Sequence, residues 1–431
     1  MYTAVPEDQP RERALLVGVG RRADKSATLD EHLDELAQLA DTAGAEEAGR
    51  LIQRRDRPDG ATYIGKGKAE QLMAQAAELG CSLVIFDDDL GATQQKNLQR
   101  LAGDNIKVID RSGLILDIFG RRARSREAKT QVELARLQYL LPRLTRQWTH
   151  LERQMGGIGT RGGMGEAQIE VDRRMIRRHI AHLQKELERI AAERRTQRSQ
   201  RKSAYRVVLV GYTNAGKSTL MNALTGAGQL VEDRLFATLD STTRKLDLPG
   251  SGSIILSDTV GFIRKLPHHL VASFRATLAE VTEADLLLNV LDASSPQVVE
   301  HDLTTRQVLR ELGADKVPII TILNKIDALA ESRAVNRLKE KFPGAILISA
   351  RQRLRLEQVE QAILEAQAAR FSHVELRVPS RKSGLLGQIY DSLDVHSRSY
   401  EEDVTVLSVS GPDEAIRAIQ HRLAQDPAPG P

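Results

Sequence analysis

The sequence contains little cysteine and few aromatic residues, and it lacks a long apolar run. Cys81 is the only cysteine among the 431 residues, which excludes an internal disulfide bond and a metal cluster held by cysteines. Aromatic residues make up 3% of the chain, so stacking platforms for single-stranded nucleic acids are not expected. No apolar run approaches the roughly 20 residues that cross a bilayer, and the acidic, proline-containing start lacks the pattern of a signal peptide. We therefore expect a cytoplasmic protein that does not insert stably into a membrane and at most associates loosely with its surface.

Charge is distributed unevenly along the chain. Residues 121–202 carry 21 Lys and Arg against 9 Asp and Glu, a net charge of +12, so the rest of the chain sums to −8. A basic segment in an otherwise acidic chain is typical of a protein with a polyanionic partner. A solvated helical face with charges of both signs would give a similar count. Charge alone leaves both interpretations open.

The order of apolar patterns predicts four parts. Residues 1–120 alternate the strand-like runs ALLVGV, SLVIFDDD and IKVID with helical stretches such as GKAEQLMAQAAEL and ATQQKNLQRLA, which predicts a small parallel α/β domain. Residues 121–202 have helical periodicity. Residues 203–370 return to α/β alternation, with strands expected at RVVLVG, SIILSD, LLLNVLDA, PIITILNK and AILISA. Residues 371–431 predict a small α+β module that ends in a disordered tail, DPAPGP. The overall fold class is therefore α/β.

The basic segment is predicted to be an antiparallel helical hairpin. Two apolar stripes flank the glycine-rich loop GGIGTRGGMGE, which carries Arg161; the first steps by 3 and 4, and the second repeats at near-heptad spacing. Pro142 should kink or break the first helix. The first stripe is Leu134, Leu137, Leu141, Leu144 and Trp148, and the second is Ile169, Ile176, Ile180, Leu183, Leu187 and Ile190.

The stretch GYTNAGKS follows an apolar strand and precedes a helix, which is the required context of a phosphate-binding P-loop. Glycines let the backbone curl so that successive N–H groups face the phosphates. We expect Lys217 to reach the β- and γ-phosphates and the Ser218 hydroxyl to bind Mg²⁺. The predicted loop consists of Gly211, Tyr212, Thr213, Asn214, Ala215, Gly216, Lys217 and Ser218.

Three further segments predict that the nucleotide is GTP or GDP. Asp258 ends an apolar strand, where its carboxylate can support the Mg²⁺ shell, and the N–H of Gly261 is spaced to contact the γ-phosphate. In the stretch LNKID, the Asp327 carboxylate can accept from both N1–H and N2–H₂ of guanine, a pair that adenine does not offer. The remaining predicted contacts are Thr259, Val260, Asn324, Lys325, Ile326, and Ser349, Ala350 and Arg351 at the guanine carbonyl. Residues 203–370 are thus predicted to be a P-loop GTPase domain.

A threonine that closes over Mg²⁺ is expected between the P-loop and Asp258. The segment LFATLDSTTRKL offers Thr238, Thr242 and Thr243, and the pattern does not choose among them.

These motifs, with others along nearly the whole chain, resemble one family closely: the HflX GTPases, which are related to translation factors and associate with ribosomes. The segments that carry the resemblance are TYIGKGKAEQL, VIFDDDL, LILDIFGRRARSREAKTQVELARLQYLLPRL, EVDRRMIRRHI, GYTNAGKSTLMNAL, FATLDSTTR, DTVGFIRKLPHHLVASFRATL and NKID. The glycine loop departs from the family pattern, because Met164 stands where relatives usually have a proline.

The resemblance implies roles for several residues. It implies that Thr238 is the Mg²⁺-binding threonine, that Asn214 helps to bind an activating K⁺, and that the protein contacts the large ribosomal subunit and its RNA. Nucleotide contacts are then also expected at Phe236, Ala237, Thr238, Leu239 and Asp240. The catalytic set is Lys217, Thr238 and Gly261, and the protein is expected to be a monomer.

Phe262 stands where many GTPases have the glutamine that orients the attacking water. A phenyl ring cannot orient water or stabilise charge, so hydrolysis by the free enzyme should be slow. One hypothesis is that hydrolysis depends on docking to a partner. The other is that Phe262 is an apolar residue that pins the switch segment to its domain. His268 and His269 lie nearby, and we expect them to face solvent or to pack.

Three functions follow from these features. The first is a GTPase that binds the large ribosomal subunit and splits or rescues stalled ribosomes, with hydrolysis stimulated by the ribosome. The second is a signalling or ribosome-assembly switch that binds a protein through the hairpin. The third is an RNA-modification enzyme with a GTPase regulator, which ranks last because residues 1–120 show no nucleophile or metal cluster.

Overall fold

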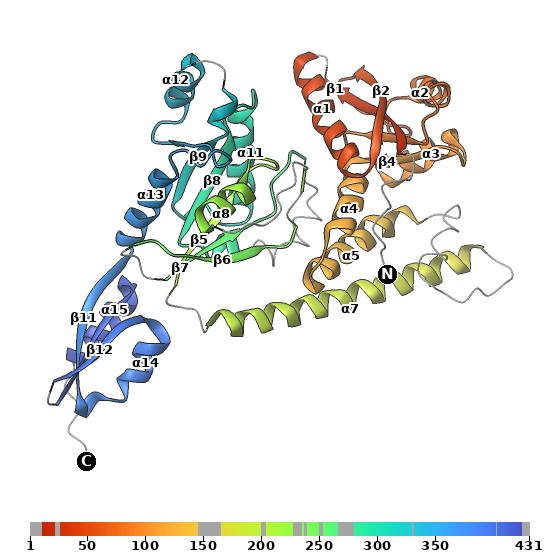
Figure 1. Ribbon diagram of the computed structural model, residues 1–431. Helices are drawn as coiled ribbons and strands as arrows, with labels where there is room; N and C mark the ends of the chain where they lie inside the picture. Colours follow the sequence, from red (N-terminus) through yellow and green to blue (C-terminus); the bar gives the residue numbers. More distant parts are fainter. Residues whose placement is uncertain are drawn as a thin grey trace. The chain divides into compact units, whose positions relative to one another are not determined.

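The computed structural model describes residues 11–21, 26–144, 165–199, 204–226, 235–236, 239–249, 253–265, 280–329, 332–401 and 403–424. The chain forms two compact units (Figure 1). The first is Met1–Glu188 with Arg234–Leu239 and Lys265–Phe274, and the second is Arg189–Asp233, Asp240–Arg264 and Arg275–Pro431. The predicted boundaries at residues 120, 202 and 370 stay predictions. Outside the described residues lie Trp148, residues 156–164 of the glycine loop with Arg161 and Met164, Ala237, Thr238, His268, His269 and the tail DPAPGP.

The first unit begins with a four-stranded parallel sheet in the order β2-β1-β3-β4. Its strands are β1 (Glu12–Gly20), β2 (Ala45–Arg54), β3 (Leu83–Phe86) and β4 (Lys107–Asp110), and its helices are α1 (Ser26–Thr42), α2 (Lys66–Glu78), α3 (Ala92–Ala102) and α4 (Arg111–Arg122). The predicted parallel α/β fold is confirmed. The edge strand β2, AEEAGRLIQR, was not predicted, because its few apolar residues do not alternate regularly.

The predicted hairpin packs as two antiparallel helices, α5 (Arg126–Leu140) and α7 (Gly165–Ser199). Arg126 pairs with Glu186, and Glu133 pairs with His179, so the contacts run in opposite directions along the two helices. Helix α5 ends before Pro142, which lies in the short 3-10 helix η1 (Leu141–Arg143). The apolar stripes meet in one buried cluster, consisting of Leu134, Leu137, Leu144, Ile176 and Leu183.

The second unit contains a six-stranded sheet in the order β10-β9-β8-β5-β7-β6. The strands are β5 (Tyr205–Val210), β6 (Thr242–Leu246), β7 (Ile254–Asp258), β8 (Leu286–Asp292), β9 (Ile319–Asn324) and β10 (Ile346–Leu347). The helices are α8 (Lys217–Thr225), α11 (Val298–Glu311), η2 (Ile326–Ala328), α12 (Ser332–Lys341) and α13 (Leu356–Ala368). Five strands match the predicted ones and are parallel. Strand β6, which runs antiparallel to β7, was not predicted. The carboxyl ends of the parallel strands share one edge, where such sheets bind ligands.

The same unit ends in a three-stranded antiparallel sheet, ordered β11-β13-β12. Its elements are β11 (Phe371–Pro379), η3 (Ser380–Lys382), α14 (Leu385–Ser392), β12 (Asp394–Glu401), β13 (Val404–Pro412) and α15 (Asp413–Ala424). Residues of the sheet and both longer helices share a core that includes Leu376, Ile389, Leu407 and Ile416. The predicted α+β module is thus present. Within the described residues, no helix is both long and apolar enough to cross a bilayer.

Candidate nucleotide site

The predicted P-loop connects β5 to α8 at the carboxyl edge of the six-stranded sheet. Its glycines adopt backbone angles that L-residues avoid, with φ of 137° at Gly211 and 92° at Gly216. A Cβ at Gly211 would lie 2.2 Å from the carbonyl oxygen of Val290 on β8, so only glycine lets the loop leave the sheet here. Asn214 has a φ of 58°, which asparagine tolerates better than most residues. The sequence motif therefore encodes the loop's shape directly.

Lys217, at the start of α8, is buried under this loop. Its side chain is 6% exposed, and its Nζ donates to the carbonyl oxygens of Gly211 at 3.1 Å and Tyr212 at 2.8 Å. Burial lowers the pKa of Lys217 to about 8, although the nearby Asp258 carboxylate acts in the opposite direction. An anion beside the ammonium would favour its charged form. The site is therefore electrostatically suited to a phosphate.

Ser218 and Asp258 meet beside Lys217. The Ser218 hydroxyl donates to the Asp258 carboxylate at 2.5 Å, which places two hard oxygen ligands together at the ends of α8 and β7. Hydroxyl and carboxylate oxygens fit Mg²⁺, which in nucleotide sites also binds phosphates and water. The neighbouring Thr259 is fully buried, and its hydroxyl donates to the carbonyl of Leu209 at 2.7 Å, so this hydroxyl supports β5.

Gly261 and Phe262 lie directly against the P-loop. The Phe262 N–H donates to the Gly211 carbonyl at 3.1 Å, and the Thr213 N–H donates to the Phe262 carbonyl at 2.8 Å. A Cβ at Gly261 would lie 2.7 Å from Thr213 Cα and 2.9 Å from Lys217 Nζ. The Phe262 side chain is 2% exposed. This geometry favours the pinning role of Phe262, because its ring is buried and its backbone pairs with the loop.

The predicted guanine-binding residues are at the same edge of the sheet. Asn324 Nδ2 donates to the Ala215 carbonyl at 2.9 Å, and the Ala350 N–H donates to Asn324 Oδ1 at 2.9 Å, so this asparagine joins the P-loop to the predicted carbonyl-binding segment. Lys325 has a φ of 64° and pairs with Asp292 at 2.8 Å. Ile326 and Asp327 begin η2, where the Asp327 side chain is exposed, and Ser349 is buried while Arg351 is exposed.

The residues predicted to form the switch segment belong to different units. Phe236 and Leu239 belong to the first unit, where the buried Phe236 ring packs edge-to-face on Phe119 with centroids 4.7 Å apart. Asp240 belongs to the second unit. Of the alternative threonines, Thr242 and Thr243 lie on β6, and the Thr243 hydroxyl is 3.1 Å from that of Ser257. The nucleotide contacts predicted at Phe236, Leu239 and Asp240 therefore stay predictions.

Three family models match the chain. Residues 30–120 match "GTP-binding GTPase N-terminal", residues 122–201 match "GTP-binding GTPase Middle Region", and residues 206–325 match "50S ribosome-binding GTPase". The chain is 45% identical over 415 residues to a GTPase HflX of Caldanaerobacter subterraneus, covering 96% of this chain and 93% of the relative. It is 42% identical over 398 residues to a GTPase HflX of Escherichia coli, covering 92% of each chain. The chain belongs to the HflX family of GTPases.

Membership in the HflX family makes the protein a P-loop GTPase, which hydrolyses GTP. Among solved structures, the chain is similar to a GTP-binding protein of the archaeon Sulfolobus solfataricus in complex with GDP. The two are 27% identical, 83% of this chain and 99% of that chain are covered, and the TM-score is 0.42.

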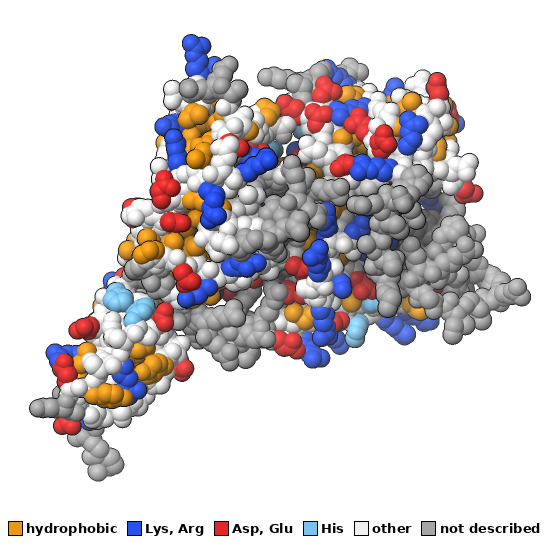
Figure 2. All heavy atoms as spheres, in the orientation of Figure 1, with side chains coloured by type: hydrophobic (Ala, Val, Ile, Leu, Met, Phe, Trp, Pro, Cys, Tyr) orange, Lys and Arg blue, Asp and Glu red, His pale blue; other side chains and the backbone are white. Residues whose placement is uncertain are grey.

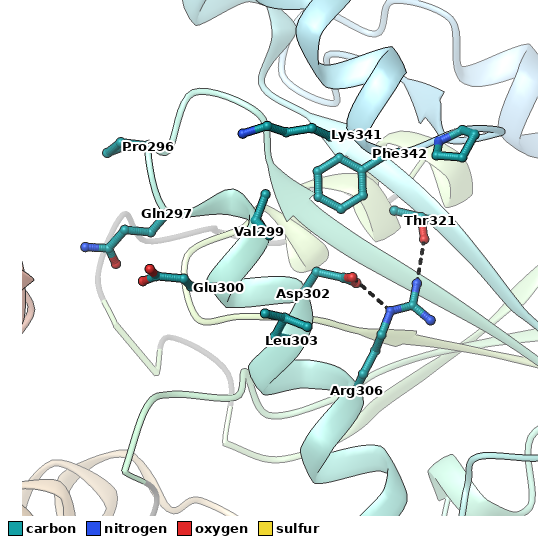
Figure 3. A pocket seen from close by; sticks show the side chains of 11 residues that line it. Pro296, Gln297, Val299, Glu300, Asp302, Leu303, Arg306, Thr321, Lys341 and Phe342 are labelled. Atoms are coloured by element: carbon teal, nitrogen blue, oxygen red, sulfur yellow. Dashed lines mark hydrogen bonds and ion pairs between the residues drawn. The ribbon is translucent and has the colours of Figure 1, made fainter.

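A pocket of about 680 Å³ lies elsewhere in this HflX-family chain, along α11. Its lining comes from α11 with the two residues before it, β9 and residues 341–343, and it includes no predicted nucleotide-binding residue. Figure 3 shows Arg306 in this lining, donating to Asp302 at 2.8 Å and to the Thr321 hydroxyl at 3.5 Å. The P-loop edge is therefore the nucleotide-site candidate.

Sequence reasoning missed one residue at that edge, His301 of α11. Its ring stacks on the Tyr212 ring, with centroids 3.9 Å apart and planes inclined by 13°. The two residues are far apart in sequence, and no motif marks this histidine, because its position depends on how α11 packs against the sheet.

Proposed function

We propose that this GTPase binds the large ribosomal subunit through a basic face of α7 and separates stalled ribosomes into subunits. In this proposal the ribosome stimulates hydrolysis of GTP to GDP and phosphate. The description of the family model matched by residues 206–325, a 50S ribosome-binding GTPase, supports the choice of partner.

The observation that carries the proposal is a row of cations on α7. Arg174, Arg178 and Lys185 are exposed and lie on the side of the helix opposite the buried Ile176 and Leu183. In the part of the chain that the structure describes, none of the three cations has an ion pair. Figure 2 shows Lys and Arg side chains gathered over this helix.

The row has the dimensions of a phosphate-binding surface. From Arg174 to Lys185 the helix rises about 16 Å, at about 1.5 Å per residue. Cations without acidic partners attract a polyanion and release its counterions, which makes binding strongly dependent on salt. RNA fits such a surface, since phosphate contacts position a protein without requiring base recognition.

The alternative of a protein partner on the apolar stripe of the hairpin has less support. Leu134, Leu137, Ile176 and Leu183 are buried between α5 and α7, so they are already used in packing the hairpin. Opposite that stripe, the exposed residues of α7 include Arg174, Arg178 and Lys185.

Lys217 and Gly261 are proposed to hold the β- and γ-phosphates, and Asn324 and Asp327 to hold the guanine. Ser218 and Asp258, joined in this proposal by Thr238, would hold Mg²⁺, which neutralises phosphate charge during transfer to water. Asn214 is proposed to bind K⁺. Because the buried Phe262 offers no polar group to the attacking water, the free enzyme is slow, and an added charge from a partner can raise such rates by about 10³–10⁵.

The test is binding of purified large subunits by a variant with Arg174, Arg178 and Lys185 all changed to Glu. Three lost phosphate contacts should weaken pelleting with subunits and lower the slope of log affinity against log salt by about 2–3. The matched control reverses Arg333, Arg337 and Lys339, which lie exposed on α12. The α7 interface would be refuted if the two variants bound large subunits with equal affinity. It would also be refuted if the affinity of the unaltered protein did not depend on salt concentration. Stimulation of GTP hydrolysis by subunits is measured in K⁺ buffer alongside.

A further inference from the structure

Tyr212, the second residue of the P-loop, contacts three other parts of the second unit: α11, the segment after β7 and Lys217 of α8. Its ring stacks on His301 of α11 with centroids 3.9 Å apart. Its hydroxyl accepts a hydrogen bond from the Arg264 N–H at 2.8 Å, and its carbonyl accepts one from Lys217 Nζ at 2.8 Å. The residue is buried, with 5% of its surface exposed. Motif reasoning explains only its backbone, because the phosphate-binding function of a P-loop does not require a phenol at this position.

The hydrogen bond from the Arg264 N–H to the Tyr212 hydroxyl extends a short series of backbone hydrogen bonds between the P-loop and the segment after β7. Phe262 exchanges backbone bonds with Gly211 and Thr213, and Tyr212 and Phe262 form an isolated parallel bridge. Arg264 is two residues further along, so the Tyr212 hydroxyl is a third attachment of the same segment. Gly261 precedes these attachments and lies against Thr213 and Lys217. The position of Gly261 relative to Lys217 therefore depends on how firmly residues 262–264 are held.

His301 fixes the direction of the phenol. A stacked neighbour restricts the tyrosine ring to one orientation, and aromatic pairs of this kind add stability beyond the area that they bury. Because His301 belongs to α11, a residue outside the P-loop orients the Tyr212 hydroxyl.

We propose that Tyr212 is a positioning residue for GTP hydrolysis: its hydroxyl, aimed by the stack on His301, holds residues 262–264 on the P-loop so that Gly261 faces the γ-phosphate. This rests on the proposed γ-phosphate contact of Gly261. GDP has no γ-phosphate, so the effect is confined to the triphosphate and to the rate.

The first test removes only the hydroxyl. Tyr212→Phe should lower kcat for GTP by about threefold to tenfold, the range that one hydrogen bond supplies. It should weaken GTP binding while GDP affinity changes less than twofold. Tyr205→Phe removes a hydroxyl from a fully buried tyrosine on β5 and is the matched control, with GTP kinetics expected to stay at the level of the unaltered protein.

The second test asks whether His301 acts through Tyr212. His301→Ala should lower kcat, and His301→Phe, which restores a ring face, should recover most of the loss. In a double-mutant cycle, His301→Ala should lower kcat little further in the Tyr212→Phe background, because the hydroxyl that the stacked ring orients is already absent.

Three results would overturn the proposal. These are unchanged kcat in Tyr212→Phe, faster hydrolysis in that variant, and equal losses of GTP and GDP affinity, which would indicate general damage to the loop. Failure of the Gly261 contact itself is distinguishable, because Gly261→Ala would then leave kcat for GTP unchanged, whatever the effect of Tyr212→Phe.

Discussion

Gly261→Ala is the substitution for which the structure gives the clearest expectation. An added Cβ would lie 2.7 Å from Thr213 Cα, 2.9 Å from Thr213 Cγ2 and 2.9 Å from Lys217 Nζ, whereas ordinary contacts begin near 3.4 Å. Thr213 Cα belongs to the backbone, and Lys217 is held by two carbonyl groups. Neither neighbour can rotate away, so the segment of Gly261 must retreat by about 0.7 Å.

A displacement of this size should affect both the stability of the protein and its rate of GTP hydrolysis. Overpacking of this kind costs about 1–3 kcal/mol of stability. A misplacement of about 1 Å in a reacting complex can cost about 100-fold in rate, so we expect kcat for GTP to fall by roughly 10- to 100-fold. GDP affinity should change less than threefold, since the predicted contact is with the γ-phosphate. Single-turnover hydrolysis, GDP titration and urea unfolding measure the three quantities.

Gly387→Ala is the matched control, because a Cβ at this position in α14 meets no atom within 4 Å. It should leave hydrolysis unchanged. If Gly261→Ala hydrolysed GTP within twofold of the unaltered protein, and unfolded at the same urea concentration, the close approach to Thr213 would not matter for catalysis. The assignment of the γ-phosphate contact to Gly261 would then be wrong.

Three further predictions concern the same edge of the sheet. Phe262→Gln should lower the free energy of unfolding by about 2–4 kcal/mol, because it buries an amide in place of a ring, and it should not raise basal hydrolysis. Phe262→Leu should lower the free energy of unfolding by about 1 kcal/mol. A Gln variant that hydrolysed GTP faster and kept its stability would contradict this. Since Lys217 has a pKa of about 8 and a bound phosphate favours its charged form, nucleotide binding at pH 8 should take up about half a proton, and affinity should fall as the pH rises further. Calorimetry in two buffers of different ionisation enthalpy measures the uptake, and zero uptake would refute the reasoning. Asn214→Ala should reduce hydrolysis in K⁺ buffer to its rate in Na⁺ buffer, and a variant that kept its preference for K⁺ would exclude this residue as a K⁺ ligand.

The P-loop could be predicted from sequence because its requirements are local. Gly211 and Gly216 have backbone angles that only glycine adopts without strain, and the strand and helix around them have strong apolar patterns. Asn324 was predicted as a nucleotide contact because it belongs to the motif LNKID, which follows an apolar strand. Its actual contacts, to Ala215 and Ala350, depend on side-chain packing that no spacing rule provides.

The strands that were not predicted have one property in common. Strands β2, β6 and β12 each lie at an edge of their sheet, and their sequences are polar or irregular. An edge strand needs only one pairing partner and one buried face, so its sequence is weakly constrained. Its position depends on a neighbour elsewhere in the chain, such as β7 for β6, and a local pattern does not contain this information.

Phe262 shows how sequence and structure complement each other at one residue. The sequence alone indicates that the chain lacks the glutamine that orients water, and it leaves two explanations open. The structure adds that the ring is buried and that the backbone of Phe262 is bonded to Gly211 and Thr213. A partner that stimulated hydrolysis by moving this side chain towards the phosphate would have to withdraw the ring from its packing and expose it. Supplying a charge, or ordering the water from outside, requires neither change, so we expect a stimulating partner to act on the phosphate and its water rather than on Phe262.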